Sequence, residues 1–322
     1  MKLFLTHNTA LEFWRLNFAE QDVLQQRRRK SVVPNSPPDV VDLQDKALFG
    51  LSLPLEVSVV DQDCRRESAF VKSHVESRKL PEGCMVDLGG DVSVASPELC
   101  FVQMANRLSL VKLIELGLEL CGTYTLAVSG EAGGSFELSD RGFNNHPPLT
   151  SVKKLKSVTD RMEGVWGLQK AKTAIQYLAD RSNSPMETIL FMLVSLPYKH
   201  GGYSLPKPEL NYLIPTVETA REPYAKTYRY CDLYWPQAGI AVEYDSDMYH
   251  TGATRIARDS IRRNALIDAD VIVLTMTSQQ LYNWQELENT VRQVANKLGR
   301  RIRTATNRDF SQKHYELRKQ LL

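Results

Sequence analysis

The feature that most constrains the fold is a pair of strand-like segments joined by four residues. Residues 230–235 and 240–245 are rich in aliphatic and aromatic side chains, and the Pro-Gln-Ala-Gly sequence between them is typical of a tight turn. We therefore predict an antiparallel hairpin. A turn formed by residues 236–239 also fixes the register, because it makes Trp235 the partner of Ile240.

Three carboxylates lie on this hairpin. The predicted register places Asp232 across from Glu243, and the alternation of side chains along a strand places Asp245 on the same face as Glu243. Like charges at opposing positions destabilise a sheet, so something should offset their repulsion. A hard divalent cation such as Mg²⁺, or Mn²⁺ in its place, binds carboxylate oxygens. We predict that these three residues form a metal site; the alternative is an acidic stripe facing solvent.

Two residues outside the hairpin are candidates for a role beside these carboxylates. Glu187 is the third residue of a helix that Ser184 would cap, and this capping box explains the glutamate by itself. A catalytic or metal-supporting role is the other interpretation. His250 follows Asp245 by five residues and is a candidate general acid or base, or a phosphate contact, because imidazole titrates near neutral pH. The alternative for His250 is an incidental structural histidine.

An arginine-rich segment follows the carboxylates. The apolar periodicity over residues 251–269 predicts a helix, with Arg255 and Arg262 on one stripe, Arg258 beside it and Arg263 next in sequence. Such a run is ordinarily a solvated face. Directly after a carboxylate cluster it is also a candidate surface for binding the phosphates of DNA, because cationic contacts supply most sequence-independent affinity.

The distribution of charge supports a polyanionic partner for the second half of the chain. Residues 1–150 hold 15 Lys and Arg against 20 Asp and Glu, a net charge of −5, whereas residues 151–322 hold 25 against 18, a net charge of +7. Hydrophobic residues make up 43% of the chain, which excludes a fibrous or wholly disordered protein. An uneven scatter of charges over two solvated surfaces is the alternative.

The length and the pattern of turns predict two domains. A segment rich in Gly, Ser, Asn and Pro over residues 129–151 indicates a boundary, which divides the chain into residues 1–150 and 151–322. The first part alternates short strands with a helical region, and the second reads helix, strands, helix, strand, helix and a basic C-terminal tail. We therefore expect the α/β class, with a mixed α/β domain preceding a mixed sheet flanked by helices.

The cysteines and the N-terminus bear on location. Five cysteines without a CxxC pair indicate neither a zinc site nor a complete disulfide framework, which fits a reducing compartment. The apolar run at the N-terminus is too short for a signal peptide, and no run reaches the length of a spanning helix. We expect a cytoplasmic protein that is not bound to a membrane.

The ordered motifs of residues 180–300 resemble the Vsr-like endonuclease domains, which are related to the very-short-patch-repair endonuclease and belong to the PD-(D/E)xK superfamily. The likeness rests on segments 184–187, 232–236 and 242–245, on His250 and Arg255, and on the helix with Arg258, Asp259, Arg262, Arg263 and Leu266. It implies a restriction-endonuclease-like sheet and Mg²⁺-dependent hydrolysis of duplex DNA. By motif, Asp232 and Glu243 would bind metal, Asp245 would support the metal or a water, Glu187 would be the helix-borne acid, and His250 the nearby histidine.

The sequence departs from this family at three positions. Asp245 occupies the position of the superfamily's generic lysine, although Glu-x-Asp is common in Vsr-like domains. Ser246 replaces a usual glycine, and residues 268–270 read Asp-Ala-Asp where a glycine is common. These departures bear on turnover and fine geometry more than on the fold. In the first half, residues 50–125 resemble AbiEi-type antitoxin proteins in their strand pattern and in residues 94–99 leading into a helix; no chemical motif accompanies this likeness.

Two other functional classes stay open from the sequence. The first is a DNA-binding regulator or antitoxin that keeps a nuclease fold without cleaving, and the intact carboxylates at 232, 243 and 245 argue against it. The second is a structure-specific or RNA-directed nuclease, because both nucleic-acid backbones satisfy the same cationic helix. For the nuclease, the roles to expect are DNA repair, restriction or phage defence.

Overall fold

The computed structural model describes most of the chain, in two compact units. The described residues are 3–20, 28–29, 32–35, 50–128, 142–214, 229–245, 271–304 and 306–322. Unit 1 comprises residues 1–136 and 140–180, and unit 2 comprises residues 137–139 and 181–322. Both units combine helices with mixed sheets, which confirms the α/β class.

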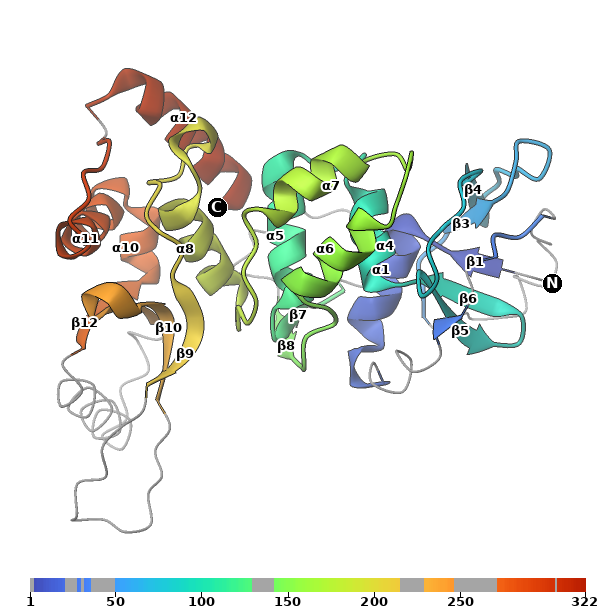
Figure 1. The fold of residues 1–322 in the computed structure, drawn as a ribbon, viewed down its shortest axis with the longest axis horizontal. Helices are drawn as coiled ribbons and strands as arrows, with labels where there is room; N and C mark the ends of the chain where they lie inside the picture. Colours follow the sequence, from blue (N-terminus) through green and yellow to red (C-terminus); the bar gives the residue numbers. More distant parts are fainter. Residues whose placement is uncertain are drawn as a thin grey trace, which may run out of the picture. The chain divides into compact units, whose positions relative to one another are not determined.

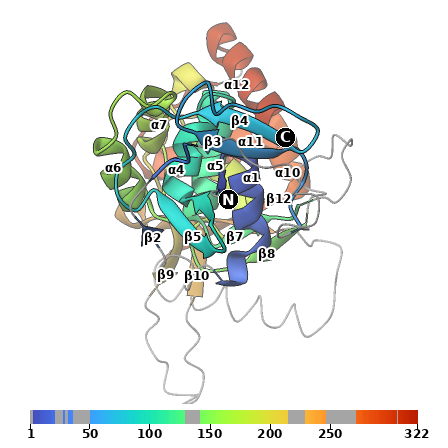
Figure 2. The ribbon, with the colours of Figure 1, turned by 90° about the vertical axis from the view of Figure 1, so that its right-hand side faces the viewer.

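Unit 1 is built on a six-stranded mixed sheet in the order β2-β5-β6-β1-β3-β4. Its strands are β1 (Leu3–Leu5), β2 (Arg28–Arg29), β3 (Leu55–Val59), β4 (Val71–Val75), β5 (Met85–Gly89) and β6 (Val92–Ala95). The short β1 lies parallel to β6 and antiparallel to β3, and β3 lies parallel to β4. Figure 2 views this sheet in front of the helices of unit 1. A second, two-stranded sheet pairs β7 (Tyr124–Leu126) with β8 (Phe143–Asn145).

The helices of unit 1 pack against one another and onto the sheet. They are α1 (His7–Leu16), α4 (Pro97–Met104), α5 (Leu110–Cys121), α6 (Val152–Asp160) and α7 (Leu168–Ile175), with a 3-10 turn η1 (Phe18–Glu20). Helices α1 and α4 contact the sheet, while α5, α6 and α7 pack on α4 (Figure 1). Ser96 begins α4 by accepting a hydrogen bond from the Leu99 N–H, with Pro97 at the first helical position.

The boundary between the units differs from the sequence expectation. The sequence predicts a boundary at residue 150, but residues 151–180 belong to unit 1. The reason is packing: α6 buries Leu155 and α7 buries Ala171 against the helices of unit 1, so this segment completes its core. A Gly- and Pro-rich segment signals a turn wherever it occurs, whereas a domain boundary depends on which apolar faces pack together.

Unit 2 is built on a four-stranded sheet in the order β12-β11-β10-β9. Its strands are β9 (Glu209–Ile214), β10 (Arg229–Trp235), β11 (Ile240–Asp245) and β12 (Ile272–Thr277). The predicted hairpin is confirmed: β10 and β11 are antiparallel and Trp235 pairs with Ile240. The turn is a 3-10 segment η3 (Pro236–Ala238) followed by Gly239, whose φ of 55° lies in the left-handed region that glycine enters without a steric cost. Strand β12 lies parallel to β11.

The helices of unit 2 begin at the caps that their sequences indicate. They are α8 (Pro185–Ser195), α10 (Ser278–Tyr282), α11 (Trp284–Lys297) and α12 (Arg308–Leu321), with a 3-10 turn η2 (Tyr198–His200). Ser184 accepts from the Glu187 N–H at the start of α8, and Thr277 forms a capping box with Gln280 at the start of α10. The helix expected between the last strand and the C-terminal tail is divided into α10 and α11, because Asn283 caps the second of them.

The expected basic C-terminal tail is a helix, α12. Four of its side chains, spaced three or four residues apart, are buried: Phe310, His314, Leu317 and Leu321. This spacing marks one face of a helix, but the high charge of the segment hides it in a reading of composition alone. Within the described ranges, no helix is both long and apolar enough to span a membrane. The five cysteines all lie in the described ranges, where they are buried and form no disulfide.

Candidate functional site

A row of four polar residues crosses the sheet of unit 2, one on each strand. Glu243 pairs with Thr275 of β12. The register that pairs Leu233 with Val242, continued by one residue, puts Asp232 across from Glu243, as expected from the turn. On the other side of β10, the pairs that flank Asp232 put it across from Asn211 of β9. The strand pairing therefore brings Asn211, Asp232, Glu243 and Thr275 to one level of the sheet.

Asp232 is held in place by the backbone of the neighbouring strand. Its Oδ2 accepts a hydrogen bond of 2.8 Å from the backbone N–H of Tyr244, the residue after Glu243. A backbone N–H that donates to a carboxylate fixes the orientation of the carboxylate. Both Asp232 and Glu243 are half-buried. The strand pairing thus places two carboxylates at adjacent positions on neighbouring strands, and the Tyr244 N–H orients that of Asp232.

Glu187 is buried and makes three side-chain hydrogen bonds. Its Oε2 accepts from the Asn183 N–H at 2.9 Å and from the Asn211 amide at 2.7 Å, and its Oε1 accepts from the Ser184 hydroxyl at 3.1 Å. Burial raises the pKa of Glu187 above the ordinary carboxyl value, although these three hydrogen bonds act in the opposite direction. Ser184 caps α8 as predicted, but Glu187 accepts from the backbone N–H of Asn183 and from the Ser184 hydroxyl, so the reciprocal bond of the predicted capping box is displaced by one residue.

Asn211 connects Glu187 to the carboxylate strands, and the sequence analysis missed it. The backbone of Asn211 has a φ of 46°, in the left-handed region that asparagine tolerates better than most residues. Its amide nitrogen also donates to the Arg181 carbonyl at 2.9 Å. An asparagine inside an apolar strand was the available signal, because asparagine is depleted in strands. The structure thus brings Glu187 next to the residue that lies across from Asp232.

Asp245 lies at the end of β11, where it pairs with Thr277, and it is half-buried. Strand alternation puts it on the side of Glu243, as predicted. The three carboxylates do not form a ready-made ligand cluster by themselves. Among the residues that the structure describes, the one group of three possible ligands within 4.8 Å of one another is His7, Glu56 and His74 of unit 1, which the sequence analysis did not consider.

Five predicted site residues lie outside the described ranges. These are His250, Arg255, Arg258, Arg262 and Arg263. Their predicted roles in proton transfer and in phosphate contacts stay predictions, as does the helix expected over residues 251–269.

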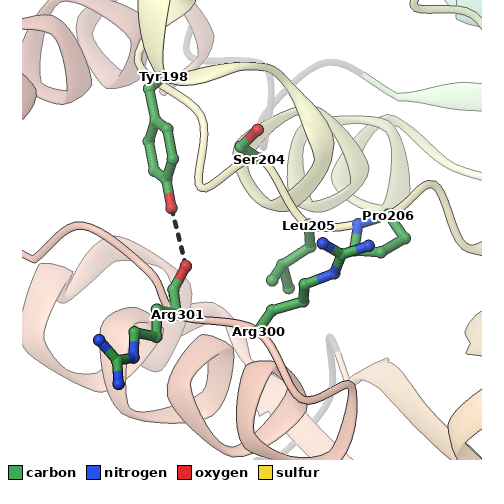
Figure 3. Close-up of a pocket in the computed structure, with 6 residues that line it drawn as sticks. All are labelled: Tyr198, Ser204, Leu205, Pro206, Arg300 and Arg301. Carbon is green, nitrogen blue, oxygen red and sulfur yellow. Dashed lines mark hydrogen bonds between the residues drawn. The ribbon is translucent and has the colours of Figure 1, made fainter.

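A basic pocket in unit 2 was also missed by the sequence analysis. It is lined by Tyr198, Ser204, Leu205, Pro206, Arg300 and Arg301 (Figure 3). The Tyr198 hydroxyl donates to the Arg301 carbonyl at 3.3 Å and accepts from the Arg303 N–H at 3.1 Å. The Arg303 guanidinium lies 4.6 Å from the centre of the Tyr198 ring. Tyr198 therefore holds the backbone of residues 301–303, which follow α11. The side chains of Arg300, Arg301 and Arg303 are exposed there.

Comparison with family models, with curated proteins and with solved structures found no match to this chain.

Proposed function

We propose that this protein is a metal-dependent endonuclease that hydrolyses DNA phosphodiester bonds at the row formed by Asp232 and Glu243. The observation that carries the proposal is the register of unit 2, in which two half-buried carboxylates stand across from each other on β10 and β11. Like charges at such positions repel, and a sheet has no structural need of them. A cation bound between the two carboxylates would offset this repulsion.

The donors of this row fit a hard cation. Asp232 and Glu243 offer carboxylate oxygens, which Mg²⁺ and Mn²⁺ prefer, and Mg²⁺ is commonly held by one or two carboxylates with water and substrate phosphate. When bound, Mg²⁺ would polarise the scissile phosphate and lower the pKa of a coordinated water. The Tyr244 N–H keeps the Asp232 carboxylate oriented before any ion arrives.

Other residues of unit 2 would support this chemistry. Asp245, on the side of Glu243, would bind the metal or accept a proton from the attacking water, and His250 would take or relay that proton. Glu187 positions the site through Asn211. Arg255, Arg258, Arg262 and Arg263 would contact the phosphates of duplex DNA, and exposed Arg300 and Arg301 add positive charge in the same unit.

The test is a cleavage assay on the full chain. Supercoiled plasmid, single-stranded DNA and RNA are each incubated with protein in Mg²⁺, Mn²⁺ or a chelator. We expect metal-dependent plasmid cleavage that is lost in Asp232→Asn and in Glu243→Gln. The matched control is Glu286→Gln, which neutralises an exposed acid of the same unit and should cut like the wild type.

Each alternative class gives a different outcome. Binding of plasmid without cleavage in any metal would favour the regulator or antitoxin class, and cleavage confined to RNA would favour an RNA-directed nuclease. Cleavage by Asp232→Asn at the wild-type rate would remove the basis of the proposal.

A further inference from the structure

The polar cluster around His7, Glu56 and His74 in unit 1 is assembled from three separate elements. His7 is the first residue of α1, Glu56 lies in β3 and His74 lies in β4. The parallel register pairs Glu56 with Lys72 and Ser58 with His74, so Glu56 and His74 stand on one face of the sheet. The Thr6 N–H donates to the Glu56 carbonyl at 2.8 Å, which brings the start of α1 against β3.

The ligand atoms of these three side chains already lie close together. One nitrogen of each histidine and one oxygen of Glu56 all lie within 4.8 Å of one another. The Glu56 Oε2 is 3.4 Å from His74 Nε2, and the ring centres of His7 and His74 are 4.0 Å apart. Two imidazoles and one carboxylate are a ligand set that binds Zn²⁺ and other transition metals rather than Mg²⁺.

Hydrogen bonds around the cluster orient the ligands. Arg107 Nη1 donates to Glu56 Oε1 at 2.7 Å, while the other oxygen of Glu56 faces His74. His7 Nδ1 lies 3.0 Å from the Thr6 hydroxyl, and a proton on Nδ1 leaves the lone pair of Nε2 for a ligand role. Outer contacts of this kind fix the ring orientation and the tautomer of metal-binding histidines.

The backbone of His7 is held in an unusual conformation. Its φ is 51°, in the left-handed region, and it is fixed by a hydrogen bond from its own N–H to Gln103 Oε1 at 3.2 Å. The Nε2 of the same Gln103 amide is buried and has no hydrogen-bond partner among the described residues. Strained backbone and an unsatisfied buried donor both concentrate at functional sites.

We propose that His7, Glu56 and His74 form a binding site for one transition-metal ion, of the zinc class, in unit 1. The site has two nitrogen ligands and one oxygen ligand, with the remaining coordination positions filled by water or by a bound anion. Arg107 keeps its hydrogen bond to Glu56 Oε1 when the metal is bound. Its second contact, from Nη2 to His74 Nε2 at 3.2 Å, is replaced by the metal. This proposal is independent of the nuclease proposal, because the two sites share no residue.

The experiment titrates Zn²⁺ into the full chain after chelator treatment, by calorimetry, and repeats the titration with Co²⁺ while recording visible absorption. His7→Asn and His74→Asn each remove one ligand, and asparagine tolerates the φ of residue 7. His200→Asn is the matched control, since His200 is a half-buried histidine of unit 2. A melting curve in chelator checks that each variant is folded.

We expect the wild type and His200→Asn to bind about one Zn²⁺ per chain, and the two ligand variants to bind at least about tenfold more weakly. Excess Mg²⁺ should not compete. Co²⁺ should give the visible bands of nitrogen ligation in the wild type, a readout that stands even if a ligand variant fails to fold. A wild type with no Zn²⁺ affinity in the micromolar range, or ligand variants that bind like the wild type, would overturn the proposal.

Discussion

The side-chain amide of Asn211 joins strand β9 to the start of helix α8, because its Nδ2 donates to Glu187 Oε2 at 2.7 Å and to the Arg181 carbonyl at 2.9 Å. Strand β9 in turn pairs with β10, which carries Asp232, so the helix cap lies beside the candidate metal row. A substitution at Asn211 should therefore change the stability of the α8 cap, and a substitution at Glu187 should change the position of β9.

Replacing Asn211 should separate the contribution of its side-chain hydrogen bonds to stability from the cost of its left-handed backbone. Asn211→Ala loses both hydrogen bonds and also places a Cβ-bearing residue at a φ of 46° without the local hydrogen bonding of asparagine. We expect a loss of about 1–3 kcal/mol in the free energy of unfolding, because buried Glu187 loses a donor. Asn211→Gly is the control, since glycine adopts this φ freely. The glycine variant should recover about 1 kcal/mol relative to alanine in urea unfolding. Equal stabilities would show that the backbone is not strained.

Glu187→Gln should change how stability depends on pH. The pKa of Glu187 is raised in the folded state by burial, so its contribution to stability is full below the ordinary value of 4.5 and is lost as pH rises through the folded-state pKa. Glutamine keeps the capping geometry without the charge. The stability of the variant relative to the wild type should therefore increase as pH rises above 4.5. Urea unfolding at several pH values measures this difference, and a difference that does not vary with pH would contradict it.

The Asp232→Asn variant tests whether a cation relieves the repulsion across the hairpin. In metal-free buffer the variant should be as stable as the wild type or more stable, by about 0.2–1 kcal/mol, the range of a cross-strand pair. Asparagine can still accept the hydrogen bond from the Tyr244 N–H. Added Mg²⁺ or Mn²⁺ should raise the melting temperature of the wild type and not of the variant. An unfolded variant would mean that the carboxylate is structural.

His314 should make unit 2 sensitive to acid. It is buried among Tyr203, Trp284 and Phe310, and its Nδ1 lies 2.7 Å from the Gly201 carbonyl, so that nitrogen carries the proton of the neutral ring. Burial lowers the pKa of His314 to about 4. Its contribution to stability is therefore present above the unfolded value of 6.5 and is lost as pH falls towards 4, by up to about 1.4 kcal/mol per pH unit.

His314→Phe should remove this acid sensitivity. Between pH 6.5 and pH 4, the free energy of unfolding of the wild type should fall relative to that of the variant. Parallel pH profiles for the two proteins would show that His314 does not titrate in this way.

Gly201 should tolerate no side chain, because it lies against helix α12. Its φ is 86°, and an added Cβ would collide with the backbone carbonyl of Lys313. Gly299→Ala is the matched control: its φ of 62° is also in the left-handed region, but nothing lies within 4 Å of an added Cβ. Gly299→Ala should cost about 1 kcal/mol from backbone strain alone. Gly201→Ala should lower the free energy of unfolding by clearly more in the same measurement. An equal loss in the two variants would mean that α12 moves away from the added Cβ.

Sequence alone determined the features that depend on neighbours in the chain. The hairpin register followed from the Pro236–Gly239 turn, the start of α8 from Ser184 and Glu187, and the α/β class from the alternation of strand and helix patterns. Each of these is a local property, since turn length, capping and periodicity act over a few residues.

Tertiary structure decided what depends on residues far apart in the chain. The assignment of residues 151–180 to unit 1, the link from Asn211 to Glu187, and the meeting of His7, Glu56 and His74 all follow from packing between distant segments. No spacing rule connects positions 7, 56 and 74, because strand order and helix docking bring them together. The same is true of α12, because most of the stability of such a charged helix comes from packing its apolar face against the rest of unit 2.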